Sequence, residues 1–390
     1  MVLEFVMKNF YPEKYKTDSL LEIRHNYLPE QFENSAEILD LIREVVEIGD
    51  FTLGQSVDEF EENFAKRIGV EHAVGVGSGT DAIFLTLKAL VDQEHGEKFE
   101  VITTPFTFYA TIGAIATANF VPVFSDISIG DFNIDPSGIS SKITQNTKAI
   151  LPVHWAGRIC RMDEINSIAK SHDLFVVEDA CHAILASYKT KMAGTFGSAG
   201  CFSFHPLKNL NVWGDGGIVV TDSLALANKL RLLRNHGLID RDTCSFFGYN
   251  SRLDTIQAVV ANYLLKNRID EITNSRIKNS KLYDEGLKEI NSLKIPQRHT
   301  QLKEVFHLYS FLAENRDALL EFLIRNGVDA KIHYPIPMHL QPAARKYGYA
   351  RGDFPVAEYV TQNIISLPVH EFVKEDQIYR VIELIRKFYS

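Results

Sequence analysis

Cysteine is scarce in this chain, and that scarcity excludes two kinds of protein. The 390 residues include four cysteines, Cys160, Cys181, Cys201 and Cys244, and no two of them form a CxxC pair. Disulfide scaffolds are shorter and much richer in cysteine, and cysteine-based metal sites, iron–sulfur clusters among them, need closer spacing. We therefore expect reduced thiols, a cytoplasmic location and no metal site.

Long apolar runs and an excess of positive charge are also missing. No uninterrupted apolar stretch reaches the roughly 20 residues of a transmembrane helix. The opening MVLEFVMKNFYPEKYK has Glu4 in its apolar start and no basic region before it, unlike a signal peptide. The 41 Lys and Arg against 50 Asp and Glu give a net charge of −9. We expect neither nucleic acid nor membrane as a partner, although a local basic pocket for a phosphorylated ligand stays open.

What is present is the composition of a globular protein, 45% hydrophobic and 23% charged, with enough length for two structural units. Between residues 70 and 221, short apolar runs alternate with helical segments, which predicts an α/β fold with a mainly parallel, doubly wound sheet. The expected strands are 71–77, 99–103, 121–124, 149–153, 174–179, 200–204 and 217–221. The expected helices between them are 80–91, 107–118 and 163–171.

The rest of the chain predicts a smaller α/β unit. A long helix over 252–274 is expected to lead into it, followed by a strand within 304–314. Helices are expected near 316–326 and 374–387. The predicted division is a helical N-terminal arm (1–45), a large domain (46–270) and a small C-terminal domain (271–390).

A glycine-rich turn follows the first expected strand. In VGVGSGTDAIFLTL (74–87), a strand leads through this turn into an amphipathic helix, whose free N–H groups favour a phosphate. The turn lacks the lysine and the spacing of a Walker A motif, and Thr80 stands at the third glycine position of GxGxxG. The turn is therefore either a phosphate site or a tight turn with an N-cap. Because the third glycine is missing, a nicotinamide-dependent oxidoreductase is disfavoured.

Two acids end the expected strand in LFVVEDACHAI (174–184). Ligands bind at the carboxyl ends of parallel strands, so Asp179, after Glu178, could pair with a cationic ring nitrogen. It could equally cap a helix or form a structural ion pair. His182 either faces the same site or is a packed histidine.

Lys208 lies in SFHPLKNLNVWGDGG (203–217), between two expected strands. An isolated lysine is usually a surface residue, but an amine in an apolar pocket has a lowered pKa and attacks aldehydes. The order of the features favours the second interpretation: a phosphate turn, a strand-end acid and a lysine on strands of one sheet. Pyridoxal phosphate needs these three, as a phosphate anchor, a partner for its pyridinium nitrogen and a Schiff-base amine.

The chain resembles the DegT/DnrJ/StrS-type sugar aminotransferases, a branch of the fold-type I pyridoxal-phosphate enzymes, from about residue 45 to the C-terminus. Many motifs carry the likeness in the right order. They are 49–83, TTPFTFYATIGAI (103–115), PVHWAG (152–157), VVEDACHA (176–183), SFHPLKNL (203–210), GDGGIVVTD (214–222), RNHG (234–237), GYNSRLDTIQA (248–258) and HYPIPMHLQP (333–342).

The resemblance implies roles for the residues at these motifs. Lys208 matches the Schiff-base lysine that also moves the proton, and Asp179 matches the partner of the pyridine nitrogen. The remaining cofactor contacts that it implies are the phosphate turn Gly79, Thr80 and Asp81, the phosphate hydroxyl of Ser203, the stacking ring of Phe108, and His182 near the 3-hydroxyl. Asn250 matches an asparagine that reaches the phosphate of the neighbouring subunit, which implies a homodimer with shared active sites.

Other residues are candidates for binding the substrate. His333, Tyr334 and His339 lie in a segment that resembles a substrate-side loop, or they pack around its prolines. Arg158 and Arg161, after HWAG, could hold an anionic group, or they lie at a solvated helix entry.

The implied activity is transfer of an amino group from an amino acid, with glutamate expected, to a keto- or aldehyde-sugar for polysaccharide, lipopolysaccharide or glycoside biosynthesis. The sugar would be nucleotide-linked, or a free sugar acid such as 8-oxo-3-deoxy-octulosonate, since residues 204–217 faintly resemble the 8-amino-3,8-dideoxy-octulosonate transaminase branch. The alternatives are a sugar dehydratase, which Lys208 disfavours because one such branch has histidine there, and a non-catalytic regulator.

The chain departs from the family pattern in two places. Residues 1–35 match no part of it, and LGQ (53–55) stands where Gly-Pro is usual. We expect that neither departure touches the chemistry.

Overall fold

A seven-stranded sheet forms the centre of the computed structural model, which describes residue 15 and residues 20–92 and 97–390. Its strand order is β1-β9-β8-β5-β4-β2-β3, and β9 runs antiparallel to both of its neighbours while the other pairs are parallel. The bounds are β1 His72–Val76, β2 Glu100–Thr103, β3 Val121–Phe124, β4 Thr147–Ile150, β5 Phe175–Asp179, β8 Ala199–Ser203 and β9 Gly217–Thr221. The predicted mainly parallel sheet and its seven strands are confirmed.

Both faces of this sheet are buried, which explains why its strands read as continuous apolar runs. Neighbouring residues of one strand belong to opposite cores: Val177 packs in one apolar cluster and Val176 in the other. Val219 and Val220 divide in the same way. This is the pattern of a parallel sheet covered by helices on both sides.

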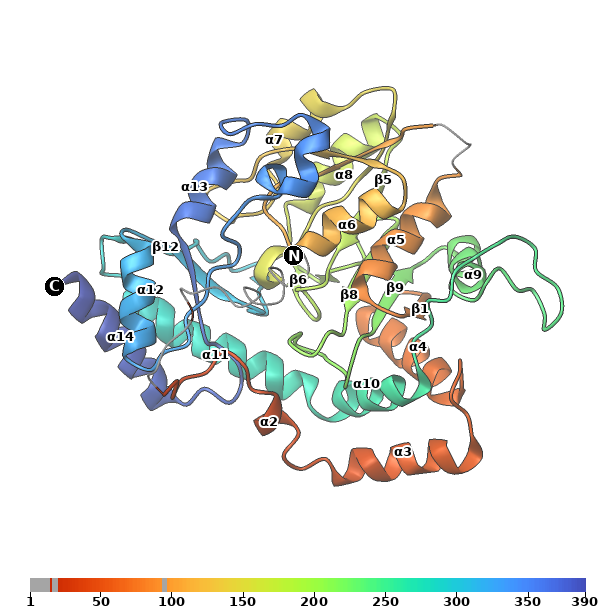
Figure 1. The fold of residues 1–390 in the computed structure, drawn as a ribbon, viewed down its shortest axis with the longest axis horizontal. Helices are drawn as coiled ribbons and strands as arrows, with labels where there is room; N and C mark the ends of the chain where they lie inside the picture. Colours follow the sequence, from red (N-terminus) through yellow and green to blue (C-terminus); the bar gives the residue numbers. More distant parts are fainter. Residues whose placement is uncertain (1–14, 16–19, 93–96) are drawn as a thin grey trace, which may run out of the picture.

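Helices α5, α6 and α9 lie together against the sheet, with α4 and α10 packed against each other (Figure 1). The three helices predicted between strands are confirmed as α5 Gly79–Leu90, α6 Tyr109–Thr117 and α8 Met162–Ser171. The others are α4 Gln55–Ile68, α7 Pro136–Ile139, α9 Leu224–Leu233 and α10 Thr255–Asn267. Short 3-10 turns occur at Ser140–Lys142, Trp155–Gly157, Met338–Leu340 and Pro342–Tyr347.

A smaller unit contains an antiparallel sheet of β10 Leu293–Lys294, β12 Tyr309–Ala313 and β13 Ile364–Leu367. Its helices are α11 Ile269–Leu287, α12 Arg316–Arg325, α13 Pro355–Asn363 and α14 Glu375–Tyr389. A third sheet of β6 Ser187–Tyr188, β7 Lys191–Met192 and β11 Leu302–Lys303 joins segments from the two units. The predicted small α/β unit is present, and the domain boundaries at 45/46 and 270/271 stay predictions.

The prediction of one helix over 252–274 is wrong. Helix α10 ends at Asn267 and α11 begins at Ile269, because Arg268 between them has φ −129° and ψ −26°. The two helices run in succession beneath the sheet, from the large unit to the small one (Figure 1).

The prediction of a helical N-terminal arm holds for only part of the described chain. Helix α3, Ala36–Ile48, packs on α10, but residues 20–27 contain no helix and lead into the short α2, Leu28–Gln31. Residues 1–14 and 16–19 of the predicted arm lie outside the described residues.

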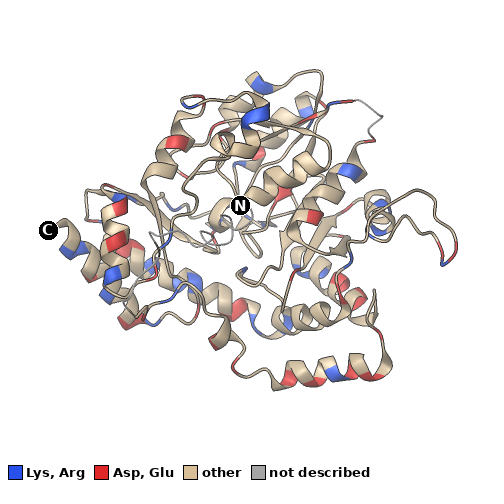
Figure 2. Ribbon diagram, in the orientation of Figure 1, with Lys and Arg blue, Asp and Glu red and all other residues tan. Residues whose placement is uncertain are grey.

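Acidic and basic residues are interspersed along the elements (Figure 2). No helix in the described part of the chain is long and apolar enough to cross a membrane.

Candidate active site

A pocket of about 240 Å³ opens at the carboxyl edge of the large sheet. The ends of β1, β5 and β8, the start of α6 and two segments of the small unit surround it. The polar and aromatic residues among its lining include Ser78, Thr80, Phe108, Thr111, Asp179, His182, Ser203, Lys208, His307, His333 and Tyr334. The sequence-predicted lysine, acid and glycine turn therefore meet in one place.

Lys208 follows β8 on a loop that returns to β9. Its side chain lines the pocket, and its amine forms no ion pair with any residue that the structure describes. Burial lowers the pKa of this amine below the usual 10.5, and the thiol of Cys181 and the carboxylate of Asp179 only partly oppose the shift. An amine with a lowered pKa is a better nucleophile at neutral pH.

Glu178 and Asp179 have different roles because consecutive residues of β5 point to opposite faces. The buried Glu178 accepts hydrogen bonds from the N–H groups of Gly194, Phe196 and Gly197, at 2.8, 2.6 and 2.7 Å. Its Oε2 also lies 2.8 Å from Nε2 of His154. Glu178 is therefore a structural acid that holds the 194–197 turn.

Asp179 lies on the pocket side of β5, where two donors orient its carboxylate. Thr111 Oγ1 donates to Oδ2 at 2.8 Å, and the Cys181 N–H donates to Oδ1 at 3.2 Å. Thr107 Oγ1 lies 2.7 Å from Thr111 Oγ1 and continues this chain of polar contacts. The sequence analysis missed both threonines, although their i, i+4 spacing in TTPFTFYATIGAI was the available signal.

The glycine turn forms the start of α5, with Ser78 as its N-cap; Ser78 Oγ accepts the Asp81 N–H at 3.1 Å. The main chain packs closely here, since a Cβ on Gly79 would lie 2.5 Å from Ser203 Cβ. The first turn of the helix and Ser203 therefore face the same end of the pocket, where N–H groups favour an anion.

His182 and Phe108 both line the pocket. The His182 ring lies 4.3 Å, centroid to centroid, from that of His307, and its Nδ1 accepts the Ala156 N–H at 3.3 Å. Burial, then the charge of Lys208, holds the pKa of His182 well below 6.5, so the imidazole is neutral. Phe108 is 45% exposed, and its ring lies 5.8 Å from that of Tyr334.

Two of the five substrate candidates face the pocket and three do not, among them Arg161, which pairs with Asp135 at 2.8 Å. His333 and Tyr334 line it. His339 is buried elsewhere, with Nε2 3.0 Å from Glu358 Oε1, and Arg158 lines separate cavities and pairs with Glu304 at 3.6 Å.

Two of the cofactor candidates also lie outside this pocket lining. Asp81 Oδ2 accepts a hydrogen bond from Ser251 Oγ at 2.8 Å. Asn250 is exposed, next to Asn235 in an antiparallel bridge.

The described part of residues 1–35 contacts the loop that carries Lys208, and the expectation that this departure does not touch the chemistry stays a prediction. The hydroxyl of Tyr27 donates to the main-chain carbonyl of Lys208 at 3.3 Å. No local pattern signals this contact, because it joins segments 181 positions apart. His307, from the small unit, is a further pocket residue that was not predicted from the sequence.

These residues fit pyridoxal phosphate. The fit rests on a pocket amine with a lowered pKa, an oriented carboxylate and a helix start that packs closely against Ser203. When bound, this cofactor supplies an aldehyde that accepts an amine and a ring that withdraws electrons.

Comparisons with known proteins agree with that fit. The model of the DegT/DnrJ/EryC1/StrS aminotransferase family matches residues 33–386. The pleiotropic regulatory protein of Geobacillus stearothermophilus is 40% identical over 365 residues, which cover 93% of this chain and 97% of that protein. The UDP-N-acetyl-3-dehydro-alpha-D-glucosamine 3-aminotransferase of Acidithiobacillus ferrooxidans is 38% identical over 351 residues, covering 90% and 93%.

The fold also matches a crystal structure, that of S. venezuelae DesV in complex with a ketimine intermediate. The TM-score is 0.90 and the sequence identity 34%, with 94% of this chain and 99% of that chain covered. The chain therefore belongs to the DegT/DnrJ/EryC1/StrS aminotransferase family and is a pyridoxal-phosphate-dependent sugar aminotransferase.

Proposed function

We propose that this enzyme transfers the amino group of glutamate to a nucleotide-linked keto-sugar, with Lys208 as the reacting amine. The observation that carries the proposal is the meeting of Lys208, Asp179 and the start of α5 around one pocket. In this arrangement the Lys208 amine would hold the cofactor and would then carry the proton that moves during amino-group transfer. Asp179, fixed by Thr111 and Cys181, holds the ring nitrogen protonated.

The residues around the lysine bind and orient the cofactor. The N–H groups at the start of α5 and the Ser203 hydroxyl bind its phosphate. Phe108 packs against its ring, and the neutral His182 meets its 3-hydroxyl. His333 and Tyr334 contact the sugar at the open side of the pocket.

Nucleotide-linked sugars are the proposed substrate class because a relative at 38% identity carries that substrate in its name. The free 8-oxo-3-deoxy-octulosonate suggested by residues 204–217 stays a prediction, as does the cytoplasmic location.

The proposed enzyme is a homodimer in which Asn250 binds the phosphate in the neighbouring subunit. Asn250 is exposed and does not line the pocket of its own chain. The segment before it carries exposed apolar residues, with Ile239 at 58% and Phe247 at 99%. Exposed apolar side chains of this kind are typical of a surface that another chain covers.

The test uses the absorption band of the lysine–cofactor link. The purified holoenzyme should be yellow, and adding glutamate should bleach that band. A panel of UDP- and dTDP-linked keto-sugars and the free octulosonate should then restore it, with mass spectrometry identifying the aminated product. A protein that stays colourless and inert with added pyridoxal phosphate contradicts the proposal.

A further inference from the structure

The N-terminal segment 20–32 connects the small unit to the loop that carries Lys208. Its first half is fixed to the small unit. The N–H groups of Glu22 and Ile23 donate to the Gly327 carbonyl at 2.9 and 3.0 Å, and Asp329 N–H donates to the Ile23 carbonyl at 2.9 Å. The Arg24 carbonyl also lies 2.8 Å from Nε2 of His370.

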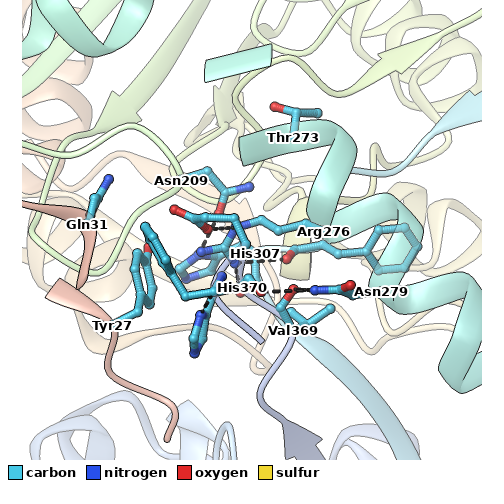
Figure 3. A network of polar contacts seen from close by, with 12 residues as sticks. Tyr27, Gln31, Asn209, Thr273, Arg276, Asn279, His307, Val369 and His370 are labelled. Carbon is cyan, nitrogen blue, oxygen red and sulfur yellow. Dashed lines mark hydrogen bonds and ion pairs between the residues drawn. The ribbon is translucent and has the colours of Figure 1, made fainter. Parts of the chain in front are cut away.

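The second half of the segment holds the lysine loop at two points. The Tyr27 hydroxyl donates to the Lys208 carbonyl at 3.3 Å, and Asn211 Nδ2 donates to Gln31 Oε1 at 2.8 Å. Figure 3 shows Tyr27 and Gln31 together with Asn209, His307 and His370 of this network.

Tyr27 is itself held firmly, so its hydroxyl is a fixed donor. Its ring stacks on His370, with centroids 4.6 Å apart and planes 25° apart, and the Arg276 guanidinium lies 5.2 Å from its centroid. The residue is 3% exposed, and burial raises the pKa of its hydroxyl to about 12. The phenol therefore stays protonated across the working pH range and donates.

The bond from Tyr27 completes the fixing of the main chain around Lys208. The Lys208 N–H donates to the His205 carbonyl at 2.8 Å, and next to it Asn209 Nδ2 donates to the Val305 carbonyl at 3.0 Å. The peptide groups on both sides of the Lys208 Cα are thus held, one by its own loop and one by Tyr27. The direction in which a side chain leaves the main chain depends on these two groups.

We propose that Tyr27 is a positioning residue for transamination, because its hydroxyl holds the Lys208 main chain and so directs the lysine amine into the cofactor pocket. The proposal rests on the proposed role of Lys208. Reacting groups must be held closely to their productive geometry, and small displacements cost large factors in rate.

Loss of the hydrogen bond from Tyr27 to the Lys208 carbonyl should also change the pKa of the Lys208 amine. The titratable groups around Lys208 are Asp179, Cys181, His182, His205, Asp215, His307, His333 and Tyr334. Burial is the main cause of the lowered Lys208 pKa, so a looser loop that admits water should raise it towards 10.5.

The test compares Tyr27→Phe with Tyr283→Phe. Both changes remove a buried hydroxyl that donates to a main-chain carbonyl, and the second acts in the small unit, where Tyr283 bonds Pro368 at 3.0 Å. Cofactor-free protein is mixed with pyridoxal 5'-phosphate, and the rate of the absorption change is followed against pH. Tyr27→Phe should slow the reaction about threefold to tenfold and raise its pH midpoint by roughly 0.3 to 1 unit. Tyr283→Phe should lower the melting temperature but leave both quantities unchanged.

Unchanged rate and midpoint in Tyr27→Phe, or equal changes in both variants, overturn the positioning role. If Tyr27→Phe does not yield folded protein, Gln31→Leu is measured in its place, with a smaller change in the same direction expected. Lys208→Ala separates this proposal from the proposed function. If borohydride still traps a covalent cofactor link in Lys208→Ala, the proposed role of Lys208 is wrong. If it traps none, the role of Lys208 holds, and the Tyr27→Phe result decides the positioning role alone.

Discussion

Thr111 donates a hydrogen bond from Oγ1 to Oδ2 of Asp179 at 2.8 Å, inside the proposed cofactor pocket. Thr111→Val keeps the shape of the side chain and removes the donor. Because hydrogen bonds to charged groups contribute about 1.5–3 kcal/mol, the cofactor dissociation constant should rise about tenfold to a hundredfold. Fluorescence titration of cofactor-free protein measures it. Thr273→Val is the matched control, since Thr273 donates to the Ile269 carbonyl in α11. An equal loss of affinity in the control contradicts the role of Thr111.

Removal of the lysine amine should abolish turnover. Lys208→Ala deletes both the nucleophile and the proton carrier, so kcat should fall by about a thousandfold or more. The fold should survive, because no ion pair with a described residue is lost. Steady-state kinetics with glutamate and the identified sugar measure the loss, and circular dichroism checks the fold. Activity close to that of the wild type would exclude Lys208 as the reacting group.

The adjacent acids of β5 should respond in opposite ways to amide substitution. Glu178→Gln places an amide NH2 against the N–H groups of Gly194, Phe196 and Gly197, so the free energy of unfolding should fall by about 2–3 kcal/mol. Asp179→Asn keeps an acceptor for the Cys181 N–H, so stability should change by less than about 1 kcal/mol while cofactor binding weakens. Urea unfolding of the cofactor-free variants, with a parallel cofactor titration, distinguishes the two. The reverse ranking of stability would contradict these assignments.

In cofactor-free protein, the contribution of Lys208 to stability should increase as the pH rises towards 10.5, opposite in sign to that of Cys160, Cys181 and Cys201, whose pKa values burial raises above 9. Burial lowers the Lys208 pKa, so between that lowered value and 10.5 the unfolded chain binds a proton that the folded chain does not. The contribution of Lys208 to the free energy of unfolding therefore increases with pH over this interval. Below the lowered pKa both the folded and the unfolded chain are protonated, and the full reduction in stability applies. Lys208→Met removes the titrating amine, so the difference in stability between the wild type and this variant should increase with pH over this interval. The measurement is the urea midpoint from pH 7 to 10.5; identical profiles for the two proteins would rule out a buried, shifted amine.

Shared active sites predict recovery of activity in mixed dimers. If Asn250 serves the neighbouring subunit, Lys208→Ala chains should be inactive alone and Asn250→Ala chains only weakly active. Unfolding and refolding them together should restore about a quarter of the wild-type activity, because half of the dimers carry one intact site out of two. No recovery, in mixtures whose dimer content is confirmed by light scattering, places Asn250 outside a shared site.

The sequence predicts the parts of the site that follow from local pattern. Lys208, Asp179 and the turn at Gly79 end or follow core strands, and parallel strands bring their carboxyl ends to one edge of the sheet. The contacts of Tyr27 and His307 depend on how the N-terminal segment and the small unit pack against the large unit. Local sequence periodicity does not predict that packing. The helix break at Arg268 could not be predicted for a related reason. The apolar periodicity continues through it, and no proline or glycine interrupts the chain there.

The alternation of Glu178 and Asp179 makes the site depend on strand register. In β5, Glu178 lies opposite Gly200 and Asp179 opposite Cys201 of β8. A slip of one residue would turn the two carboxylates to the wrong faces, burying one without its N–H donors and removing the other from the pocket. A misaligned chain would thus lose stability and cofactor binding together, so partly folded molecules cannot acquire activity before the sheet is correctly paired.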